Sequence, residues 1–348
     1  MNSPTLAPGL ADTAHPHGVS VRAPGRLHLG FLDPAGTLGR RFGSLGLVID
    51  GFDTHVEIGP AEVNTVTATS GPGTCGPAEL DRAAAHLASL QRHTGRSQPL
   101  HLRLRQLPPA HAGFGSGTQL ALAIGRAFAA WHGLNVATPT LAAWLGRGLR
   151  SGVGIAGFDQ GGLLLDGGPG APGHSAPLLA RLDLPEDWRV ILLLDPRLQG
   201  LSGADEKQAL AGLPPLPRAS SAELCHQVLM RILPAAADGQ FAPFAAGVTR
   251  LQQVLGAHFA PAQQGRAYTS AAVGQALQWI ATQAGEAGAA IGQSSWGPTG
   301  FAIVPSPAAA ETLLRETRAA GVLAPELTAH IVRGRNHGAV VSAAHSNP

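Results

Sequence analysis

The residue types that point most directly to chemistry lie in a segment rich in glycine and hydroxyl groups, residues 108–119, which runs into a helix-like apolar pattern. Gly113, Gly115 and Gly117 let backbone amides approach a ligand without an intervening Cβ, and a helix that begins near Ser116 adds unpaired amides and a positive dipole end. The pattern is also typical of an ordinary glycine-rich turn with Ser116 or Thr118 as N-cap. As a binding segment it predicts a cradle for phosphate or diphosphate, formed by Gly113, Gly115, Ser116, Gly117, Thr118 and Gln119.

A second chemical pattern lies in residues 22–33, where arginine and histidine alternate with apolar residues in a predicted strand. Because side chains alternate across a strand, Arg26, His28 and Gly30 share one face, and Asp33 lies beside the same strand. Arginine and histidine are unfavourable in a core, so this face either meets solvent, which is the usual explanation, or lines a cleft.

A second glycine-dense segment, residues 150–162, ends in a single carboxylate, Asp159, before an apolar strand at 163–165. An acid in this position could bind Mg²⁺, stabilise a cation or act as a base. It could equally cap a turn. A third segment, residues 292–300, joins two short predicted strands and offers hydroxyls, an amide and the indole of Trp296, although by itself it could be a simple turn.

Composition narrows the class of protein. The chain has 348 residues, 44% apolar residues and a net charge of +2, which suits one large domain or two ordinary ones and disfavours nucleic acid as a partner. Its basic residues are dispersed and almost all arginine, with Lys207 the only lysine, and we treat this bias as background. Cys75 and Cys225 are too far apart for a thiolate metal site, which favours a reduced cytoplasm.

No membrane anchor is expected, because the longest apolar run, residues 190–194, is far too short to span a bilayer. Residues 1–18 lack the pattern of a signal peptide and are predicted to be a flexible tail. The oligomeric state stays open, with a homodimer as one option.

Hydrophobic periodicity predicts a strand-rich first third, then a mixture of helices and strands without a strict βαβ rhythm, which favours the α+β class. The Gly/Pro-rich stretch at residues 167–173 marks a domain boundary. We therefore expect an N-terminal domain at 19–170 and a C-terminal domain at 180–342. Predicted strands cover 19–21, 27–31, 45–49, 55–58, 63–69 and 100–104, and predicted helices cover 79–93 and 120–131.

Taken in order, these segments resemble the GHMP small-molecule kinase superfamily, with its early strand motif, central P-x-x-x-G-x-G-S phosphate loop and late glycine-containing loop. Within it, the chain is most similar to the β-ribofuranosylaminobenzene 5′-phosphate synthase family of tetrahydromethanopterin biosynthesis, over residues 19–340. The runs that carry this are Arg-Leu-His-Leu-Gly at 26–30, Gly-Phe-Gly-Ser-Gly-Thr-Gln at 113–119, residues 151–162, and Gln-Ser-Ser-Trp-Gly-Pro-Thr at 293–299.

The resemblance implies a two-domain GHMP-kinase-like fold, with a strand-rich N-terminal domain that contains a left-handed βαβ-type phosphate-loop unit and a ferredoxin-like C-terminal domain. It implies condensation of phosphoribosyl diphosphate with 4-aminobenzoate or 4-hydroxybenzoate, with release of CO₂ and diphosphate, and Mg²⁺ as cofactor. The implied catalytic residues are Asp159, His28 and Arg26, the arene or ribose contacts are Ser294, Ser295, Trp296 and Thr299, and the metal ligands are Ser116 and Asp159.

Several roles stay open under this resemblance. Arg26 could pair with the benzoate carboxylate or with a ribose phosphate, and His28 could position or deprotonate the para group. Trp296 could stack on the arene or plug its own loop. The late loop has Trp296 and Pro298 where kinases of the superfamily have small flexible residues, so ATP-dependent phosphorylation is the second alternative. A non-catalytic ligand-binding protein is the third.

Overall fold

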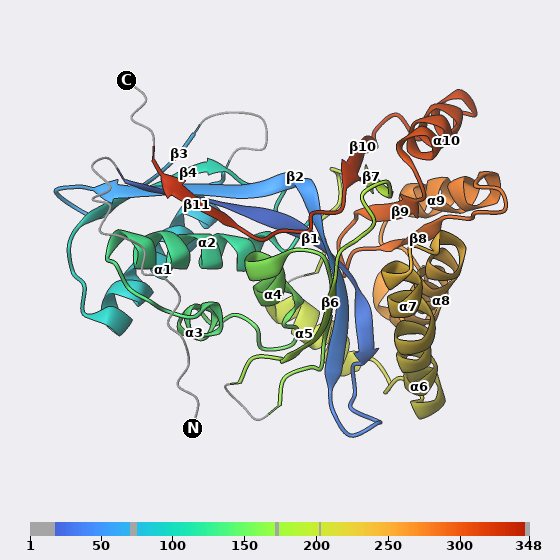
Figure 1. The fold of residues 1–348 in the computed structure, drawn as a ribbon, viewed down its shortest axis with the longest axis horizontal. Helices are drawn as coiled ribbons and strands as arrows, with labels where there is room; N and C mark the ends of the chain where they lie inside the picture. Colours follow the sequence, from blue (N-terminus) through green and yellow to red (C-terminus); the bar gives the residue numbers. More distant parts are fainter. Residues whose placement is uncertain (1–17, 70–74, 171–173, 202, 345–348) are drawn as a thin grey trace.

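The computed structural model describes residues 18–69, 75–170, 174–201 and 203–344 (Figure 1). Two long antiparallel strands, β1 (Val19–Asp33) and β2 (Phe42–Pro60), form the spine of a seven-stranded sheet. Residues 55–60 of β2 pair with β4, whereas residues 44–47 pair with β5, so one strand serves two neighbours along its length. The other strands of this sheet are β3 (Thr65–Ala68), β4 (Leu100–Gln106), β5 (Leu163–Asp166), β6 (Leu178–Leu182) and β11 (Val340–Ala343).

Four helices gather beside the first sheet: α1 (Pro77–Thr94), α2 (Ser116–Trp131), α3 (Thr138–Trp144) and α4 (Val153–Gln160) (Figure 1). Helix α1 connects the parallel strands β3 and β4. Helix α2 is apolar on nearly every side, with ten of its sixteen residues buried, which is the pattern of a helix surrounded by protein. Its central position fixes the glycine-rich segment that precedes it.

The second sheet contains β7 (Arg189–Leu194), β8 (Ala290–Gln293), β9 (Gly300–Val304) and β10 (Thr328–Arg333). Its order is β10-β7-β9-β8, and every pair is antiparallel. Numbered along the chain, this is the order 4-1-3-2, which confirms the ferredoxin-like arrangement expected from the sequence. Its helices are α6 (Arg218–Gln227), the π-helical turn η1 (Val228–Ile232), α7 (Leu233–Ala237), α8 (Phe241–Phe259), α9 (Ala271–Gln283) and α10 (Pro307–Ala319); α5 (Gly203–Gly212) and the 3₁₀ turn η2 (Ala260–Gln263) complete the described helices.

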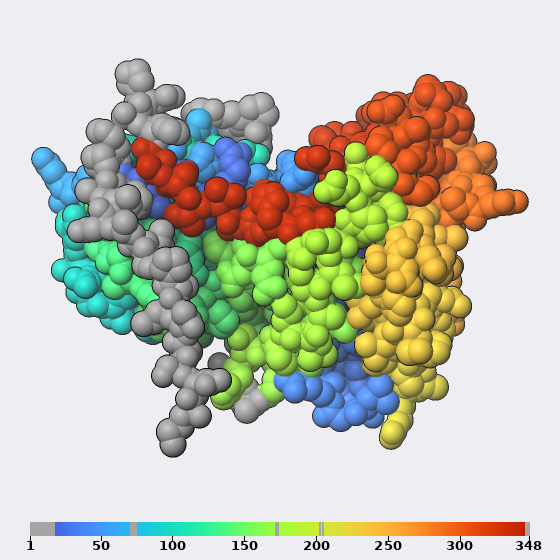
Figure 2. Space-filling model, viewed as in Figure 1, coloured from blue at the N-terminus to red at the C-terminus, as the bar shows by residue number. Residues whose placement is uncertain are grey.

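The two sheets do not divide at the predicted boundary of 170–180. Strand β6 lies beyond the Gly/Pro-rich stretch yet pairs with β5, so that stretch connects two strands of the same sheet. The chain also returns at its C-terminal end, where β11 pairs with β1. Figure 2 shows this C-terminal segment, in red, lying across the N-terminal half. One core contains residues of both sheets, among them Leu29 and Leu47 with Val190 and Leu192.

The described residues contain no helix that is both long and apolar enough to cross a membrane.

Candidate active site

A cavity of about 730 Å³ opens where the glycine-rich segment meets β1 and the second half of the chain. Residues from six further segments line it: β1, α1, the loop at 146–151, the first turn of α4, Leu201 with residues 203–207, and the late loop at 295–297. Segments far apart in the sequence thus converge at the N-terminus of α2. Gly113, Gly115, Ser116, Gly117 and Thr118 all line this cavity, as the phosphate-cradle hypothesis requires.

The N-terminus of α2 is left open toward the cavity. Its N-cap is Gly115, with a φ of +71°, and no side chain caps the helix, so neither Ser116 nor Thr118 plays the N-cap role. The left-handed conformation favours glycine, and a Cβ on Gly115 would lie only 2.8 Å from the guanidinium carbon of Arg26. Uncapped amides at a helix N-terminus can bind an anion.

Gln119 does not line the cavity. Its buried side-chain amide donates to the backbone carbonyl of Gly154 over 2.9 Å and thereby ties α2 to α4. The predicted contact of Gln119 with phosphate is therefore not supported, and the residue positions α2 against α4 instead. Its side chain starts one turn into the helix and points to the neighbouring helix rather than to the cavity.

Arg26 lies beneath the phosphate loop. Its backbone amide donates to the carbonyl of Phe114 over 3.1 Å, and its Nη1 donates to the carbonyl of Gly113 over 3.2 Å. Its Nε is buried without a hydrogen-bond partner among the described residues, and no carboxylate lies within ion-pair distance in that part of the chain. Burial lowers its pKa to about 10, so the side chain is still cationic at neutral pH.

His28 lies next to Arg26 on the same strand, where a bulge interrupts the pairing of β1 and β2 between His28 and Gly30. Burial, and then the charges of Arg26 and Arg150, lower its pKa to about 3, so the imidazole is neutral at pH 7. Its Nε2 is buried without a partner among the described residues, and its ring packs edge-on against Phe31. Of the two predicted options, a strand face toward a cleft is therefore the correct one for Arg26 and His28.

The four predicted site residues of the late loop fall into two groups, one that lines the cavity and one that does not. Ser295 and Trp296 line the cavity, and Trp296 also packs on Phe259 at a ring distance of 4.6 Å. Ser294 and Thr299 are fully buried and do not line it. The Ser294 hydroxyl donates to the carbonyl of Gly113 over 2.7 Å and accepts from the backbone amide of His28 over 3.0 Å. Ser294 thus holds the phosphate loop against β1, and a direct ligand contact from Ser294 or Thr299 is not supported.

Asp159 lies outside the cavity, contrary to its predicted catalytic role. Gly154, in the first turn of α4, lines the cavity, whereas Asp159 is exposed in the last turn, about 7 Å farther along the axis at 1.5 Å per residue. Its carboxylate accepts a hydrogen bond from the hydroxyl of Thr138 over 2.6 Å. The side chain therefore links α4 to α3.

The predicted magnesium ligands do not form a pair, because Ser116 lines the cavity and Asp159 does not. In the described part of the chain, no group of three or more histidine, cysteine, aspartate or glutamate side chains could hold a metal. The two carboxylates that line the cavity, Glu79 and Glu206, are already paired with Arg82 and Arg150. The side chains alone therefore do not fit a resident Mg²⁺ site.

Most of the charge in this cavity comes from residues that no sequence motif indicated. Beside Arg26, the lining contains Arg82, Arg147, Arg150 and Lys207. These residues are spread over more than 120 positions, and the arginine bias had been treated as background. The strongest available signal was Lys207, the only lysine in the chain. With two carboxylates against five cations, the lining has a clear excess of positive charge, which suits a polyanionic ligand.

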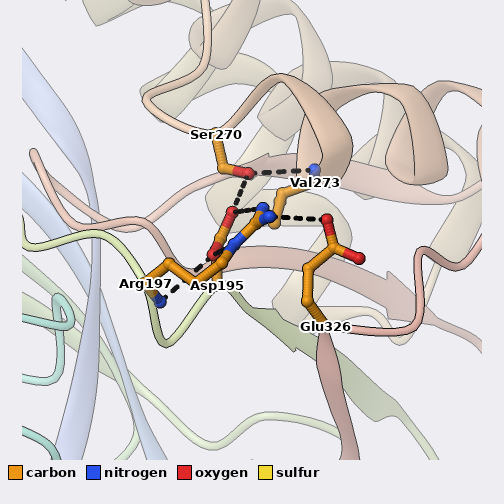
Figure 3. Close-up of polar contacts among 5 residues, drawn as sticks. All are labelled: Asp195, Arg197, Ser270, Val273 and Glu326. Carbon is orange, nitrogen blue, oxygen red and sulfur yellow. Dashed lines mark hydrogen bonds and ion pairs between the residues drawn. The ribbon is translucent and has the colours of Figure 1, made fainter.

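Leu201 and residues 203–207 form one wall of the cavity. They follow the turn after β7, which is fixed by a network of paired charges (Figure 3). The carboxylate of Asp195, at the end of β7, accepts two hydrogen bonds of 2.9 Å from Arg197 and one of 2.8 Å from the hydroxyl of Ser270, the N-cap of α9. Arg197 also pairs with Glu326 at 2.7 Å. Farther along, Gly200 donates to the carbonyl of His111, which joins this wall to the phosphate loop.

Comparisons with known proteins agree with this fold. The GHMP kinases N terminal domain matches residues 81–165, and the GHMP kinases C terminal family matches residues 232–323. Among solved structures, homoserine kinase from Cytophaga hutchinsonii has a TM-score of 0.66 at 14% identity and covers 96% of this chain and 100% of its own. Mevalonate diphosphate decarboxylase from Enterococcus faecalis has a TM-score of 0.67 at 13% identity, with 94% and 99% covered. At these identities the likeness shows the fold alone.

Sequence relatives are more specific. The β-ribofuranosylphenol 5′-phosphate synthase of Archaeoglobus fulgidus is 34% identical over 298 residues, which cover 82% of this chain and 88% of the relative. The protein of the same name from Methanothermobacter thermautotrophicus is 31% identical and covers 67% and 74%. With this identity and coverage, together with the GHMP fold and the phosphate loop at the cavity, the chain belongs to the β-ribofuranosylphenol 5′-phosphate synthase family of the GHMP kinase superfamily.

Proposed function

We propose that this protein is a pentosyltransferase that joins a para-substituted benzoate to the ribose of phosphoribosyl diphosphate, with loss of CO₂ and diphosphate. The relatives are named for a ribofuranosylphenol product, which favours 4-hydroxybenzoate over 4-aminobenzoate as the acceptor. The observation that carries the proposal is a single cavity that brings an uncapped helix N-terminus and five cationic side chains next to an end lined by His28, Phe31 and Trp296.

The proposed reaction exchanges one bond at the ribose and one at the arene. The bond between ribose C1 and the diphosphate oxygen breaks, and its electron pair leaves with diphosphate. The ring carbon that bears the carboxylate then bonds to C1. Loss of CO₂ returns the electron pair of the broken C–C bond to the ring and restores aromaticity. An electron-donating para group supports attack from that carbon.

Negative charge develops on the departing diphosphate, so groups that stabilise this charge accelerate the reaction more than groups that only bind the donor. We assign this task to the first-turn amides of α2, Arg26 and Arg150, because all of them line the cavity and both arginines act on His28. Arg26 is held by a carbonyl, and Glu206 offsets its charge only from beyond ion-pair distance, so its guanidinium is available to the ligand. This placement favours a phosphate partner for Arg26 over the benzoate carboxylate, whose departure a tight pair would oppose.

The part of the cavity beside Arg26 suits an aromatic acceptor. His28, Phe31 and Trp296 are all buried and line the cavity together. A neutral imidazole with an unpartnered Nε2 can hydrogen-bond a para hydroxyl and accept its proton as the ring attacks. We propose this role for His28, and a flat packing surface for the arene from Trp296.

The direct test is release of ¹⁴CO₂ from carboxyl-labelled 4-hydroxybenzoate and 4-aminobenzoate by the purified protein with phosphoribosyl diphosphate and Mg²⁺. We expect release that requires phosphoribosyl diphosphate and is faster with 4-hydroxybenzoate. Reactions with ATP in place of the donor serve as the control. Absence of release with either acceptor, or ATP-dependent phosphorylation instead, would overturn the proposal in favour of a kinase or a ligand-binding protein.

A further inference from the structure

The arginines of the cavity fall into two groups on different sides of the N-terminus of α2. A Cβ on Gly115 would lie 2.8 Å from the guanidinium carbon of Arg26, whereas a Cβ on Gly117 would lie 3.6 Å from Nη1 of Arg147. Gly115 is the N-cap of α2 and Gly117 lies in its first turn. Arg26 and Arg147 therefore approach different residues of the helix N-terminus.

The surrounding side chains support the same division. The pKa of His28 is lowered by burial and then by the charges of Arg26 and Arg150. The pKa of His86, which lies in α1, is lowered to about 4 by burial and then by the charges of Arg147 and Arg82. Each histidine thus has a different arginine pair as its charged neighbours. We call Arg26 with Arg150 the inner pair, and Arg82 with Arg147 the outer pair.

The outer pair has more positive charge than the chain balances. Arg82 pairs with Glu79, one turn earlier in α1. Within the described residues, Arg147 has no carboxylate partner, and its Nε is buried without a hydrogen bond. Burial and the charge of Arg82 lower the pKa of Arg147, which shows that its charged form is under strain. A second arginine and a helix N-terminus add further positive charge, so a bound anion would be stabilised at this position.

The geometry of the loop around Arg147 fixes the position of its backbone. Gly146 and Gly148 flank it with φ values of +66° and +82°, and its backbone amide donates to the carbonyl of Ala142 over 2.7 Å. A Cβ on Gly148 would lie 2.5 Å from Cδ1 of Ile155, so the loop is packed closely against α4. From this backbone position, the planar guanidinium of Arg147 can bind two phosphate oxygens at once.

The proposed donor has a diphosphate at C1 and a monophosphate at C5 of its ribose. Each of the two arginine pairs can therefore be assigned to one of these groups. The arene attacks the same C1 that carries diphosphate, which places the diphosphate next to the arene end of the cavity. His28 belongs to that end and has the inner pair as its neighbours. Resting on the proposed function, we propose that Arg147 and Arg82 form a separate subsite for the 5′-monophosphate of the ribose donor.

The test uses binding rather than turnover, with ligands that fill one subsite each. Ribose 5-phosphate is titrated calorimetrically into protein saturated with inorganic diphosphate, and diphosphate is titrated into the free protein. The variants are Arg147→Gln in the outer pair, Arg150→Gln in the inner pair, and Arg315→Gln, an exposed arginine of α10 remote from the cavity lining, as the matched control.

We expect Arg147→Gln to weaken ribose 5-phosphate binding at least tenfold and to leave the Kd of diphosphate within about twofold, because a charge-assisted hydrogen bond is lost at one subsite only. Arg150→Gln should mainly weaken diphosphate. Arg147→Lys should restore part of the lost affinity. Thermal melting should show that Arg147→Gln is at least as stable as the wild type, since it removes an unpaired charge.

Two results separate the inference from the function on which it rests. If the wild type forms labelled C-riboside but Arg147→Gln weakens both ligands equally, or neither, the subsite assignment is overturned and the proposed function stands. If the wild type binds neither diphosphate nor ribose 5-phosphate, both are overturned.

Discussion

Arg26 lies at the glycine-rich segment before α2, and Arg197 lies in the turn after β7. The two arginines have opposite electrostatic surroundings. Arg26 is half-buried in the cavity with its Nε fully buried, its described side-chain hydrogen bond goes to a carbonyl, and burial lowers its pKa. Arg197 is half-exposed, makes two hydrogen bonds to Asp195 and one ion pair with Glu326, and these carboxylates raise its pKa (Figure 3).

The contrast separates two uses of charge in the same molecule. A buried charge that the chain does not neutralise is unfavourable, and it is retained where a ligand neutralises it. A paired charge can be satisfied without any ligand, and its removal should change stability rather than chemistry. Arg26 and Arg147 belong to the first class, and the network at the end of β7 belongs to the second.

The largest effect should follow Arg26→Met. We expect kcat/KM for C-riboside formation to fall about 10³-fold, because a charge that stabilises the leaving diphosphate is lost, while the melting temperature stays the same or rises. Steady-state kinetics and thermal melting of the same preparation measure both. A loss of activity that is accompanied by a fall of 10 °C or more would place Arg26 in the structural class and break the comparison.

His28 should make the free energy of unfolding depend on pH, because its imidazole is buried and neutral in the folded protein. Its folded pKa of about 3 lies below the ordinary value of 6.5, so the unfolded chain takes up a proton in this interval and the folded chain does not. Stability from the neutral ring is therefore complete above pH 6.5 and falls as the pH is lowered toward 3, by about 1.4 kcal/mol per pH unit. Denaturant unfolding of wild type and His28→Gln between pH 6.5 and 4.5 should differ by that slope. Parallel pH profiles would show that His28 is not the neutral buried group described here.

The paired network predicts a smaller effect of a different kind. Asp195→Asn should lower the free energy of unfolding by about 2 kcal/mol, because a buried carboxylate loses charge-assisted hydrogen bonds, while kcat/KM changes by less than about fivefold. The pKa of Asp195 is lowered to about 2, mainly by Arg197, so this stability is present above pH 3.8 and is lost as the pH falls through 2. Urea unfolding at pH 7 and pH 3 measures it. A 100-fold loss of activity with unchanged stability would contradict the proposed division.

The sequence located the chemical segments well, but it misjudged how glycine was used within them. Residues 150–162 are dense in glycine, a pattern typical of a loop, yet Val153–Gln160 form α4. A Cβ on Gly157 would lie 2.8 Å from Cγ2 of Val48, so this glycine allows the helix to pack closely on β2. Likewise, the predicted short strands at 19–21 and 27–31 are one strand, continued through irregular pairing near Gly25 and Gly30.

The cation cluster was beyond the reach of the sequence for a different reason. Arg82, Arg147 and Arg150 come from α1 and from the loop before α4, and nothing in their spacing distinguishes them from solvated surface arginines. Only the packing of α1, α2 and α4 places them in one cavity. Arg26 and His28 were within reach, because a period of two on a predicted strand is a local signal.

The smallest effect is expected at Asp159, which the family resemblance implied as a catalytic residue and metal ligand. Its exposed carboxylate accepts a hydrogen bond from Thr138, and Thr138 accepts one of 2.6 Å from Arg126, so the side chain joins α4 to neighbouring helices at a distance from the cavity lining. Asp159→Asn keeps a carbonyl oxygen as the acceptor. We expect kcat/KM within about twofold of the wild type and a stability change below about 1 kcal/mol. A loss of turnover comparable to that of Arg26→Met would mean that α4 rearranges when substrates bind, and it would return Asp159 to the reaction.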